Sequence, residues 1–336
     1  MKRFWKILIA VAGGLLLLCA GGFAWFLMMP PKPAPIIEPG PTGRRVVEND
    51  LFANYFLAPG PGRKPAILLL GGSEGGLGKD VHREAILLQK AGFNVLQAGY
   101  FNVPGKPGYL ADVPLEAFFH AIDWLKARPE SDPGAVGIVG YSKGAEAALL
   151  VAAHRADIQA VVAGMPSSVV WGGMSMRSYI FGGVSSWSVG GKPVPSLDYG
   201  SGEGKRELLP RFVNALKQLD AHPDTIIPVE RFGGKLLLVC GERDTLWPAC
   251  PMARQIVTRV RTARPNGVEL LAYPEAGHGV MGAPLPASDP AMRKWAALGG
   301  TAQANAAARS DSWSRIVAFL DMTLKRQVPA SSPSPS

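Results

Sequence analysis

Cysteine and histidine are scarce in this sequence, and charged residues are few. Its 336 residues include three Cys and five His, and 18% of all residues are charged. Three irregularly spaced cysteines are too few for a disulfide-based scaffold and match no zinc pattern. The histidines are scattered and form no metal-binding constellation. The sequence therefore predicts neither a metal ion nor another cofactor.

Runs of basic residues are also missing, although the formal net charge is +9. Arg44-Arg45 and Lys205-Arg206 are isolated pairs, so we interpret the surplus as a solvated basic surface and exclude nucleic acid as a partner. We find no internal repeat. The share of hydrophobic residues, 47%, together with 40 Gly and 30 Pro, indicates a globular chain with many turns. Neither composition nor pattern predicts an oligomeric state.

One long apolar run is present, at the N-terminus. Lys2, Arg3 and Lys6 precede an uncharged stretch, residues 7–29. As a helix this stretch is about 34 Å long, enough to cross a hydrocarbon core of about 30 Å. Residues 1–29 are thus a transmembrane anchor or a signal. We favour an uncleaved single-pass anchor, because apolar residues continue past the small residues Ala20-Gly21-Gly22.

The positive charges before the anchor favour a cytoplasmic N-terminus. The body of the chain would then lie outside the cytoplasm, on the periplasmic side if the protein is bacterial. Residues 30–43 are a Pro-rich linker, expected to form a semi-rigid spacer. Residues 328–336 are rich in Ser and Pro and are expected to be a disordered tail. Residues 44–327 remain for a single domain.

Within that domain, short apolar runs alternate with longer amphipathic ones. This alternation predicts a mostly parallel, doubly wound α/β sheet. The predicted strands are Ala66–Leu70, Phe93–Gln97, Val136–Val139, Ile158–Ala163, Lys235–Val239 and Val268–Tyr273, with an additional edge strand around Arg45–Leu57. The predicted helices are Lys79–Ala91, Pro114–Ala127, Lys143–His154, Glu207–Leu219, Met252–Arg261 and Ser310–Lys325.

Residues 166–229 interrupt this alternation. They combine aromatic and methionine residues with Gly and Ser, and a helix follows. An insertion of this length between two strands predicts a lid over one edge of the sheet. Most of its aromatic residues are expected to pack the lid onto the core, and only a few to reach a ligand.

Gly140-Tyr141-Ser142-Lys143-Gly144 is a G-x-S-x-G pentapeptide between a predicted strand and a predicted helix. This context is typical of the nucleophile turn of α/β hydrolases, where flanking glycines permit a strained backbone. A Gly-rich turn with a solvent-exposed serine is the simpler alternative, which the strand–turn–helix context disfavours. We therefore predict that Ser142 is a nucleophile.

A serine hydroxyl needs a base, which an acid in turn orients. In this fold the acid and then the histidine follow the serine along the chain. Asp244 and His278 each come just after a predicted strand, so we predict that His278 is the base and Asp244 its partner. Glu242 competes for the acid role, but the turn-forming residues after Asp244 favour the latter. The other histidines, expected to be structural, are His82, His120, His154 and His222.

An oxyanion needs two backbone donors. The amide of Lys143 is one candidate, and the amide of Ser73 in the run Gly71–Gly76 is the other. That run lacks the Gly-Lys-Ser/Thr ending of a phosphate-binding loop. Lys143 and Glu146 are interpreted as a helical side-chain pair without a chemical role.

Several motifs resemble one family, the C-terminal catalytic domain of acyl-CoA thioester hydrolases and bile acid-CoA:amino acid N-acyltransferase. They are residues 71–76, 112–116, 140–146, 166–171, 185–187, 241–248 and 276–278. The likeness runs from about Arg44 to about Lys325. It implies an α/β-hydrolase fold with the Ser142, Asp244 and His278 triad, and a small-molecule acyl ester or thioester as substrate.

The sequence departs from that family in two respects. Animal members carry an immunoglobulin-like domain before the hydrolase, where this chain has an apolar segment and a proline-rich one. The amino-acid transferases use Cys as nucleophile, whereas this chain has Ser142, which favours hydrolysis. Location adds a conflict, because acyl-CoA is cytoplasmic and the anchor is predicted to place the domain outside.

Cys240 and Cys250 bracket Asp244 and could form a disulfide or remain two buried thiols.

Three functions stay open. The first is an acyl-(thio)ester hydrolase, the second is a serine peptidase or acylpeptide-type hydrolase, and the third is a membrane-tethered scaffold without activity. A complete triad disfavours the scaffold, and the lack of room for a β-propeller before residue 44 disfavours the peptidase.

Overall fold

The computed structural model describes residues 2–28, 31–199 and 208–325. Four predictions fall wholly or partly outside these residues. They are the tail 328–336, the last two residues of the domain 44–327, the junction of anchor and linker at residues 29–30, and the start of the lid helix at Glu207.

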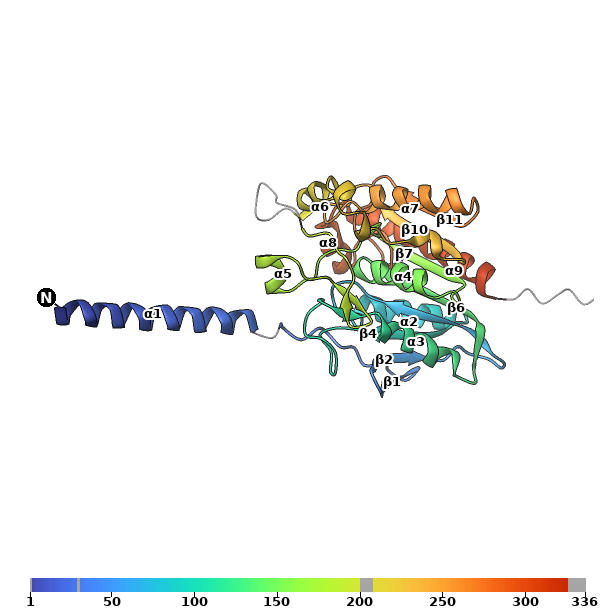
Figure 1. Ribbon diagram of the computed structural model, residues 1–336. Helices are drawn as coiled ribbons and strands as arrows, with labels where there is room; N and C mark the ends of the chain where they lie inside the picture. Colours follow the sequence, from blue (N-terminus) through green and yellow to red (C-terminus); the bar gives the residue numbers. More distant parts are fainter. Residues whose placement is uncertain (1, 29–30, 200–207, 326–336) are drawn as a thin grey trace, which may run out of the picture.

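Helix α1 (Lys2–Met28) is the apolar N-terminal segment, and Figure 1 shows it projecting away from the body. Its stretch Arg3–Phe26 has a mean hydropathy of 2.4, and its most apolar part is not buried against the rest of the chain. A helix of this length and composition can cross a membrane, and a signal sequence shares these properties. Anchoring therefore stays a prediction.

The proline-rich segment contains no helix or strand between residues 31 and 42, but it is not a free spacer. The amide of Ile37 donates to the Leu77 carbonyl over 3.0 Å, and the Asn54 side chain donates to the Ile37 carbonyl over 2.9 Å. Ile36 packs against a small apolar cluster that includes Leu77. The expectation of a spacer needs correction, because the segment lies along the body.

A sheet of eight strands forms the centre of the body, in the order β1-β2-β4-β3-β6-β7-β10-β11. Its strands are β1 (Gly43–Glu48), β2 (Leu51–Phe56), β3 (Lys64–Leu70), β4 (Asn94–Gly99), β6 (Ser131–Tyr141), β7 (Ala160–Gly164), β10 (Lys235–Gly241) and β11 (Val268–Tyr273). From β4 to β11 every neighbouring pair is parallel, which confirms the predicted mostly parallel sheet.

The first two strands are antiparallel to their neighbours. The single edge strand predicted around Arg45–Leu57 is in fact this β1–β2 hairpin. Asn49, at a φ of 52°, begins the turn between the two strands. Asn tolerates positive φ better than most residues, so the chain can reverse there within two residues.

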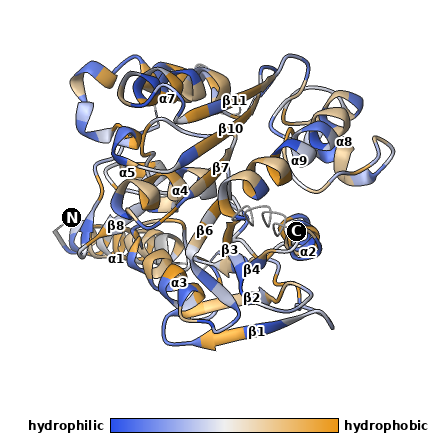
Figure 2. Cartoon of the chain, turned by 90° about the vertical axis from the view of Figure 1, so that its right-hand side faces the viewer, coloured by the Kyte–Doolittle hydropathy of each residue, from blue (hydrophilic) through white to orange (hydrophobic). Residues whose placement is uncertain are grey.

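Helices cover both faces of the sheet, as Figure 2 shows. Helices α2 (Lys79–Lys90) and α9 (Ala302–Leu324) lie on one face, and α3 (Glu116–Lys126), α4 (Lys143–His154) and α7 (Ala249–Ala263) lie on the other. Helix α9 begins eight residues before the predicted start at Ser310. Sequence analysis did not predict α8 (Pro290–Ala296), which Asp289 caps and which packs beside α9.

The predicted lid, which we call the cap, lies between β7 and β10. It contains α5 (Met176–Phe181), β8 (Trp187–Val189), β9 (Lys192–Pro193), α6 (Leu208–Leu216) and short 3-10 turns at Leu219–Ala221, Pro223–Thr225 and Val229–Arg231. Strand β5 (Val113–Pro114) pairs with β8, so α3 begins after it and not at Pro114. Trp171 and Trp187 are fully buried and attach the cap to the core.

Candidate active site

Ser142 is the single residue between β6 and α4, and its backbone is strained. Its φ of 49° and ψ of −115° lie in a region that residues with side chains rarely adopt. Its amide donates to the Gly164 carbonyl at the end of β7 over 2.8 Å. A Cβ on Gly140 would collide with the Gly144 backbone, and one on Gly144 with the Gly71 carbonyl. The tight strand-to-helix turn therefore requires both glycines.

Asp244 and His278 lie in contact, after β10 and β11 respectively. Asp244 Oδ2 is 2.7 Å from His278 Nδ1, and only 7% and 3% of these residues is exposed. The second carboxylate oxygen accepts hydrogen bonds from the amides of Leu246 at 2.8 Å and Trp247 at 3.2 Å. Because a carboxylate accepts hydrogen bonds, His278 Nδ1 is the donor in this contact.

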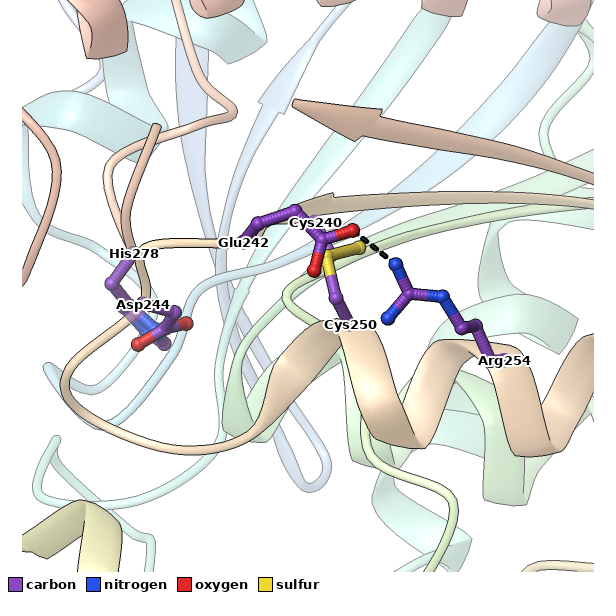
Figure 3. Close-up of a disulfide and its surroundings, with 6 residues drawn as sticks. All are labelled: Cys240, Glu242, Asp244, Cys250, Arg254 and His278. Carbon is purple, nitrogen blue, oxygen red and sulfur yellow. Dashed lines mark hydrogen bonds and ion pairs between the residues drawn. A yellow bond between two sulfur atoms is a disulfide. The ribbon is translucent and has the colours of Figure 1, made fainter. Parts of the chain in front are cut away.

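Glu242, the competing acid, points away from His278. Its carboxylate forms an ion pair with Arg254 on α7 (Figure 3). A disulfide joins Cys240 and Cys250, one of the two alternatives that the sequence left open. Figure 3 shows that it ties the end of β10 to the start of α7, so it closes the loop that carries Asp244.

A segment that sequence analysis missed connects the acid loop to the histidine loop. The carbonyl of Leu298 accepts hydrogen bonds from the amide of Thr245 at 3.3 Å and the amide of His278 at 3.2 Å. Gly299 and Gly300 follow, both at positive φ. The Gly-Gly pair before α9 is the only signal in the sequence that could have indicated this close approach.

The loop after β3, residues 71–76, lies beside Ser142. A Cβ on Gly72 would stand 3.3 Å from the Ser142 Cβ, a tight contact that the glycine avoids. The Tyr100 hydroxyl is 2.7 Å from the Gly71 carbonyl oxygen and 2.8 Å from that of Gly72. The Glu74 carboxylate is folded back onto the loop. Although Glu74 as a whole residue is exposed, desolvation of its carboxylate raises its pKa, while hydrogen bonds from its own amide and from those of Gly72 and Gly76 oppose the rise.

Lys143 and Glu146 form a buried ion pair, Nζ to Oε2 at 2.7 Å. The other Glu146 oxygen accepts hydrogen bonds from the Trp171 amide at 3.0 Å and from Trp187 Nε1 at 2.8 Å. Burial raises the pKa of Glu146, and its bonds to Lys143 oppose this. The sequence showed the helical pair but not that Glu146 holds two tryptophans of the cap against α4.

Ser142 opens onto a largely apolar pocket of about 80 Å³ beneath the cap. The two residues predicted as oxyanion donors, Ser73 and Lys143, also line it, so the structure brings both beside Ser142. The other lining residues are Trp171, Met174, Tyr199, Leu208, Arg211, Phe212, Leu246 and Trp247. Trp247 also meets the His278 ring, with centroids 6.1 Å apart.

Among the described residues, no cluster of His, Cys, Asp or Glu is arranged to hold a metal ion. Three of the four remaining histidines belong to helices: His82 to α2, His120 to α3 and His154 to α4. His120 contacts Asp50 and His154 contacts the Leu150 carbonyl. His222 lies between two 3-10 turns of the cap.

Sheet order, strand-to-helix turn and cap together define an α/β hydrolase, and solved structures agree. A putative dienelactone hydrolase from Klebsiella pneumoniae subsp. pneumoniae MGH 78578 has a TM-score of 0.51 at 17% identity, covering 80% of this chain and 92% of that one. A puromycin-hydrolyzing peptidase of Mycobacterium tuberculosis has a TM-score of 0.56 at 14% identity, covering 87% and 41%. Such low identities show the fold alone.

Within this class, the chain belongs to the family described as BAAT / Acyl-CoA thioester hydrolase C terminal, which matches residues 113–326. The resemblance inferred from the motifs is confirmed. Acyl-coenzyme A amino acid N-acyltransferase 2 of Rattus norvegicus is 30% identical over 301 residues, 87% of this chain and 69% of that protein. Mitochondrial acyl-coenzyme A thioesterase 2 of Mus musculus is 28% identical over 292 residues, 86% of this chain and 62% of that protein. The chain thus spans about two thirds of the length of these relatives.

Proposed function

We propose that this protein is a serine hydrolase that cleaves acyl thioesters or esters through a covalent acyl-Ser142 intermediate. The observation that carries the proposal is the strained Ser142 at the pocket, together with a buried acid–base pair whose atoms are 2.7 Å apart. The names of the relatives support acyl thioesters as the substrate class, because both thioesterases and acyl-CoA-dependent acyltransferases occur among them.

The proposed mechanism assigns one role to each of the three residues. His278 Nε2 takes the proton of Ser142 as the Ser142 oxygen attacks the acyl carbon. The bond from the acyl carbon to sulfur or oxygen then breaks, and His278 protonates the leaving group. Water attacks the acyl-serine in the same way, giving a carboxylic acid and restoring the hydroxyl. Asp244 holds the Nδ1 proton and stabilises the imidazolium.

For the oxyanion we assign the amides of Lys143 and Ser73. The Lys143 amide is at the N-terminus of α4, where the first amides lack partners within the helix. In the loop after β3, the Glu74 carboxylate engages the amides of Gly72 and Gly76, which supports Ser73 as the second donor. Loss of one such donor lowers kcat about 100- to 1,000-fold in enzymes of this chemistry.

Water is the proposed acyl acceptor. An acyl-serine is an oxygen ester that water can turn over, and the transferases that this chain resembles use Cys at the matching position.

We also propose that α1 is an uncleaved anchor and that the catalytic body lies outside the cytoplasm. The leaving group is then an alcohol or thiol other than cytoplasmic CoA. A reporter enzyme fused after residue 45 tests this orientation. Reporter activity found only in the cytoplasm would show that the body lies on the cytoplasmic side.

The test uses the full chain in detergent micelles. A fluorophosphonate probe should label the wild-type chain and not Ser142→Ala. Labelling that survives in Ser142→Ala contradicts the nucleophile assignment. A panel of nitrophenyl esters and acyl-CoAs of varied chain length then identifies the substrate, and added glycine tests whether an amine competes with water. Ser73→Ala keeps the backbone amide and should remain active, so it serves as the matched control.

A further inference from the structure

The chain leaves its apolar helix close to the catalytic edge of the body. The Asn102 side chain donates to the Lys32 carbonyl over 2.6 Å, and Pro31 packs next to Gly108. Helix α1 ends at Met28, only four residues before Lys32. Because four extended residues reach at most about 14 Å, the end of α1 must lie within that distance of the attachment point.

The attachment point belongs to the loop that supports the cap. In this loop, between β4 and β5, the Leu110 carbonyl accepts a hydrogen bond from the Met174 amide over 2.7 Å. Met174 lines the Ser142 pocket, and α5 begins two residues after it. Figure 1 shows α1 leaving the body on the side where α5 and α6 lie, while the C-terminal end of α9 is on the opposite side.

Two helices of the cap carry exposed apolar side chains. Helix α5 carries Ile180 and Phe181, which are 44% and 63% exposed, and α6 carries Leu208 and Val213, which are 41% and 38% exposed. Among the described residues outside α1, only three other large hydrophobic side chains are exposed. They are Val47, Leu57 and Met322, each on a different element or loop of the body.

Helix α6 reaches from the exposed apolar side chains to the pocket of the nucleophile. Leu208 is partly exposed and also lines the pocket onto which Ser142 opens. Phe212, one turn farther along α6, is buried in the same pocket wall. A long acyl chain bound at Ser142 could extend along these residues and emerge among the exposed apolar side chains.

We propose that Ile180, Phe181, Leu208 and Val213 together form a cap face that lies against the lipid bilayer that α1 crosses. The substrate is then an acyl ester or thioester whose acyl chain is dissolved in that bilayer. The bilayer fits as the partner because the short, docked connection to α1 holds this face at the membrane surface. Apolar side chains at such a surface bury their area at the headgroup–acyl boundary. This inference rests on the proposed hydrolase function and on α1 remaining attached.

The first experiment places the full chain in phosphatidylcholine vesicles and compares two substrates. One is a palmitoyl ester confined to the vesicle, and the other is a water-soluble butyryl ester. Phe181→Asp should lower turnover of the palmitoyl ester by about tenfold or more, because a charge at position 181 opposes burial at the bilayer. The same variant should leave turnover of the butyryl ester within about twofold of the wild-type rate. Met322→Asp, an exposed position on the far end of α9, is the matched control and should change neither rate.

The second experiment needs no activity. A fluorophore attached at Phe181→Cys, in a chain that also carries Cys19→Ser, should be quenched by brominated lipid, and one attached at Met322→Cys should not. Absence of quenching at position 181, or equal loss of both esterase activities in Phe181→Asp, overturns the bilayer contact. If neither ester is turned over and the fluorophosphonate probe does not label Ser142, the hydrolase proposal fails, while quenching still decides the contact.

Discussion

The buried pair of Lys143 and Glu146 yields the sharpest prediction about how the cap is attached. In Glu146→Gln the amide oxygen can still accept from the Trp171 amide and Trp187 Nε1, as Glu146 Oε1 does. Its NH₂ group then faces the Lys143 ammonium, which is only 5% exposed and has lost its partner. Removing one member of a buried ion pair costs about 3–5 kcal/mol, so we expect the free energy of unfolding to fall by about that amount.

The double variant Lys143→Met/Glu146→Gln is the matched control. It removes both charges while keeping the acceptor for the two tryptophan donors, and Met replaces Lys143 at similar volume. Because the two residues are in contact, the costs of the single substitutions should not add. We expect the double variant to recover at least about 2 kcal/mol relative to Glu146→Gln, since no unpaired charge remains buried.

The assay is guanidinium unfolding of the full chain in micelles, followed by tryptophan fluorescence, with linear extrapolation to zero denaturant. Turnover of the butyryl ester, measured in parallel, should fall in Glu146→Gln because the unpaired Lys143 also lines the pocket beside Ser142. A loss below about 1 kcal/mol in Glu146→Gln, with no recovery in the double variant, would show that the ion pair does not stabilise the fold.

Three further predictions concern the acid, the disulfide and a buried carboxyl group. Asp244→Asn should lower kcat by about three to four orders of magnitude with little change in stability, because the acceptor that sets the His278 tautomer is lost. A decrease in kcat of less than tenfold contradicts the role of Asp244 as the acid. Reduction of the Cys240–Cys250 disulfide should lower the free energy of unfolding by about 2–4 kcal/mol, and a Cys250→Ser chain should then be insensitive to reductant. Burial raises the pKa of Glu84 to about 8 from an ordinary value of 4.5. The folded state therefore holds this proton while the unfolded state releases it, so stability falls as pH rises from about 4.5 to about 8. Relative to wild type, Glu84→Gln should gain up to about 4 kcal/mol between pH 5 and pH 8.5 in denaturant titrations, and a constant difference across that range contradicts the reasoning.

Much of the fold could be predicted from local patterns. Continuous apolar runs such as Ala66–Leu70 predict strands buried on both faces, and all six parallel strands were predicted this way. The residues around Ser142 indicate a nucleophile turn because two glycines at fixed spacing are a local requirement of that backbone. Motifs in order along the chain were sufficient to identify the family, which the family match confirms.

Contacts between segments distant in sequence could not be predicted in this way. Nothing near Glu146 in the sequence indicates that tryptophans 25 and 41 residues later donate to its carboxylate. Leu298 likewise contacts two loops through a backbone carbonyl, a group that every residue carries and that leaves no compositional signal. Whether Cys240 pairs with Cys250 depends on the distance and orientation of the two side chains in the folded chain, which their spacing in the sequence does not fix.

The sequence by itself therefore determined the α/β architecture and placed Ser142, Asp244 and His278 after strand ends, because periodicity and turn chemistry are local properties. The turn-forming residues after Asp244 favoured it over Glu242, but only the tertiary structure shows the contact of Asp244 with His278 and the ion pair of Glu242 with Arg254 on α7. It also decided that the proline-rich segment lies along the body. Proline composition fixes the backbone torsions of a segment, but only the surface beside it determines whether the segment packs.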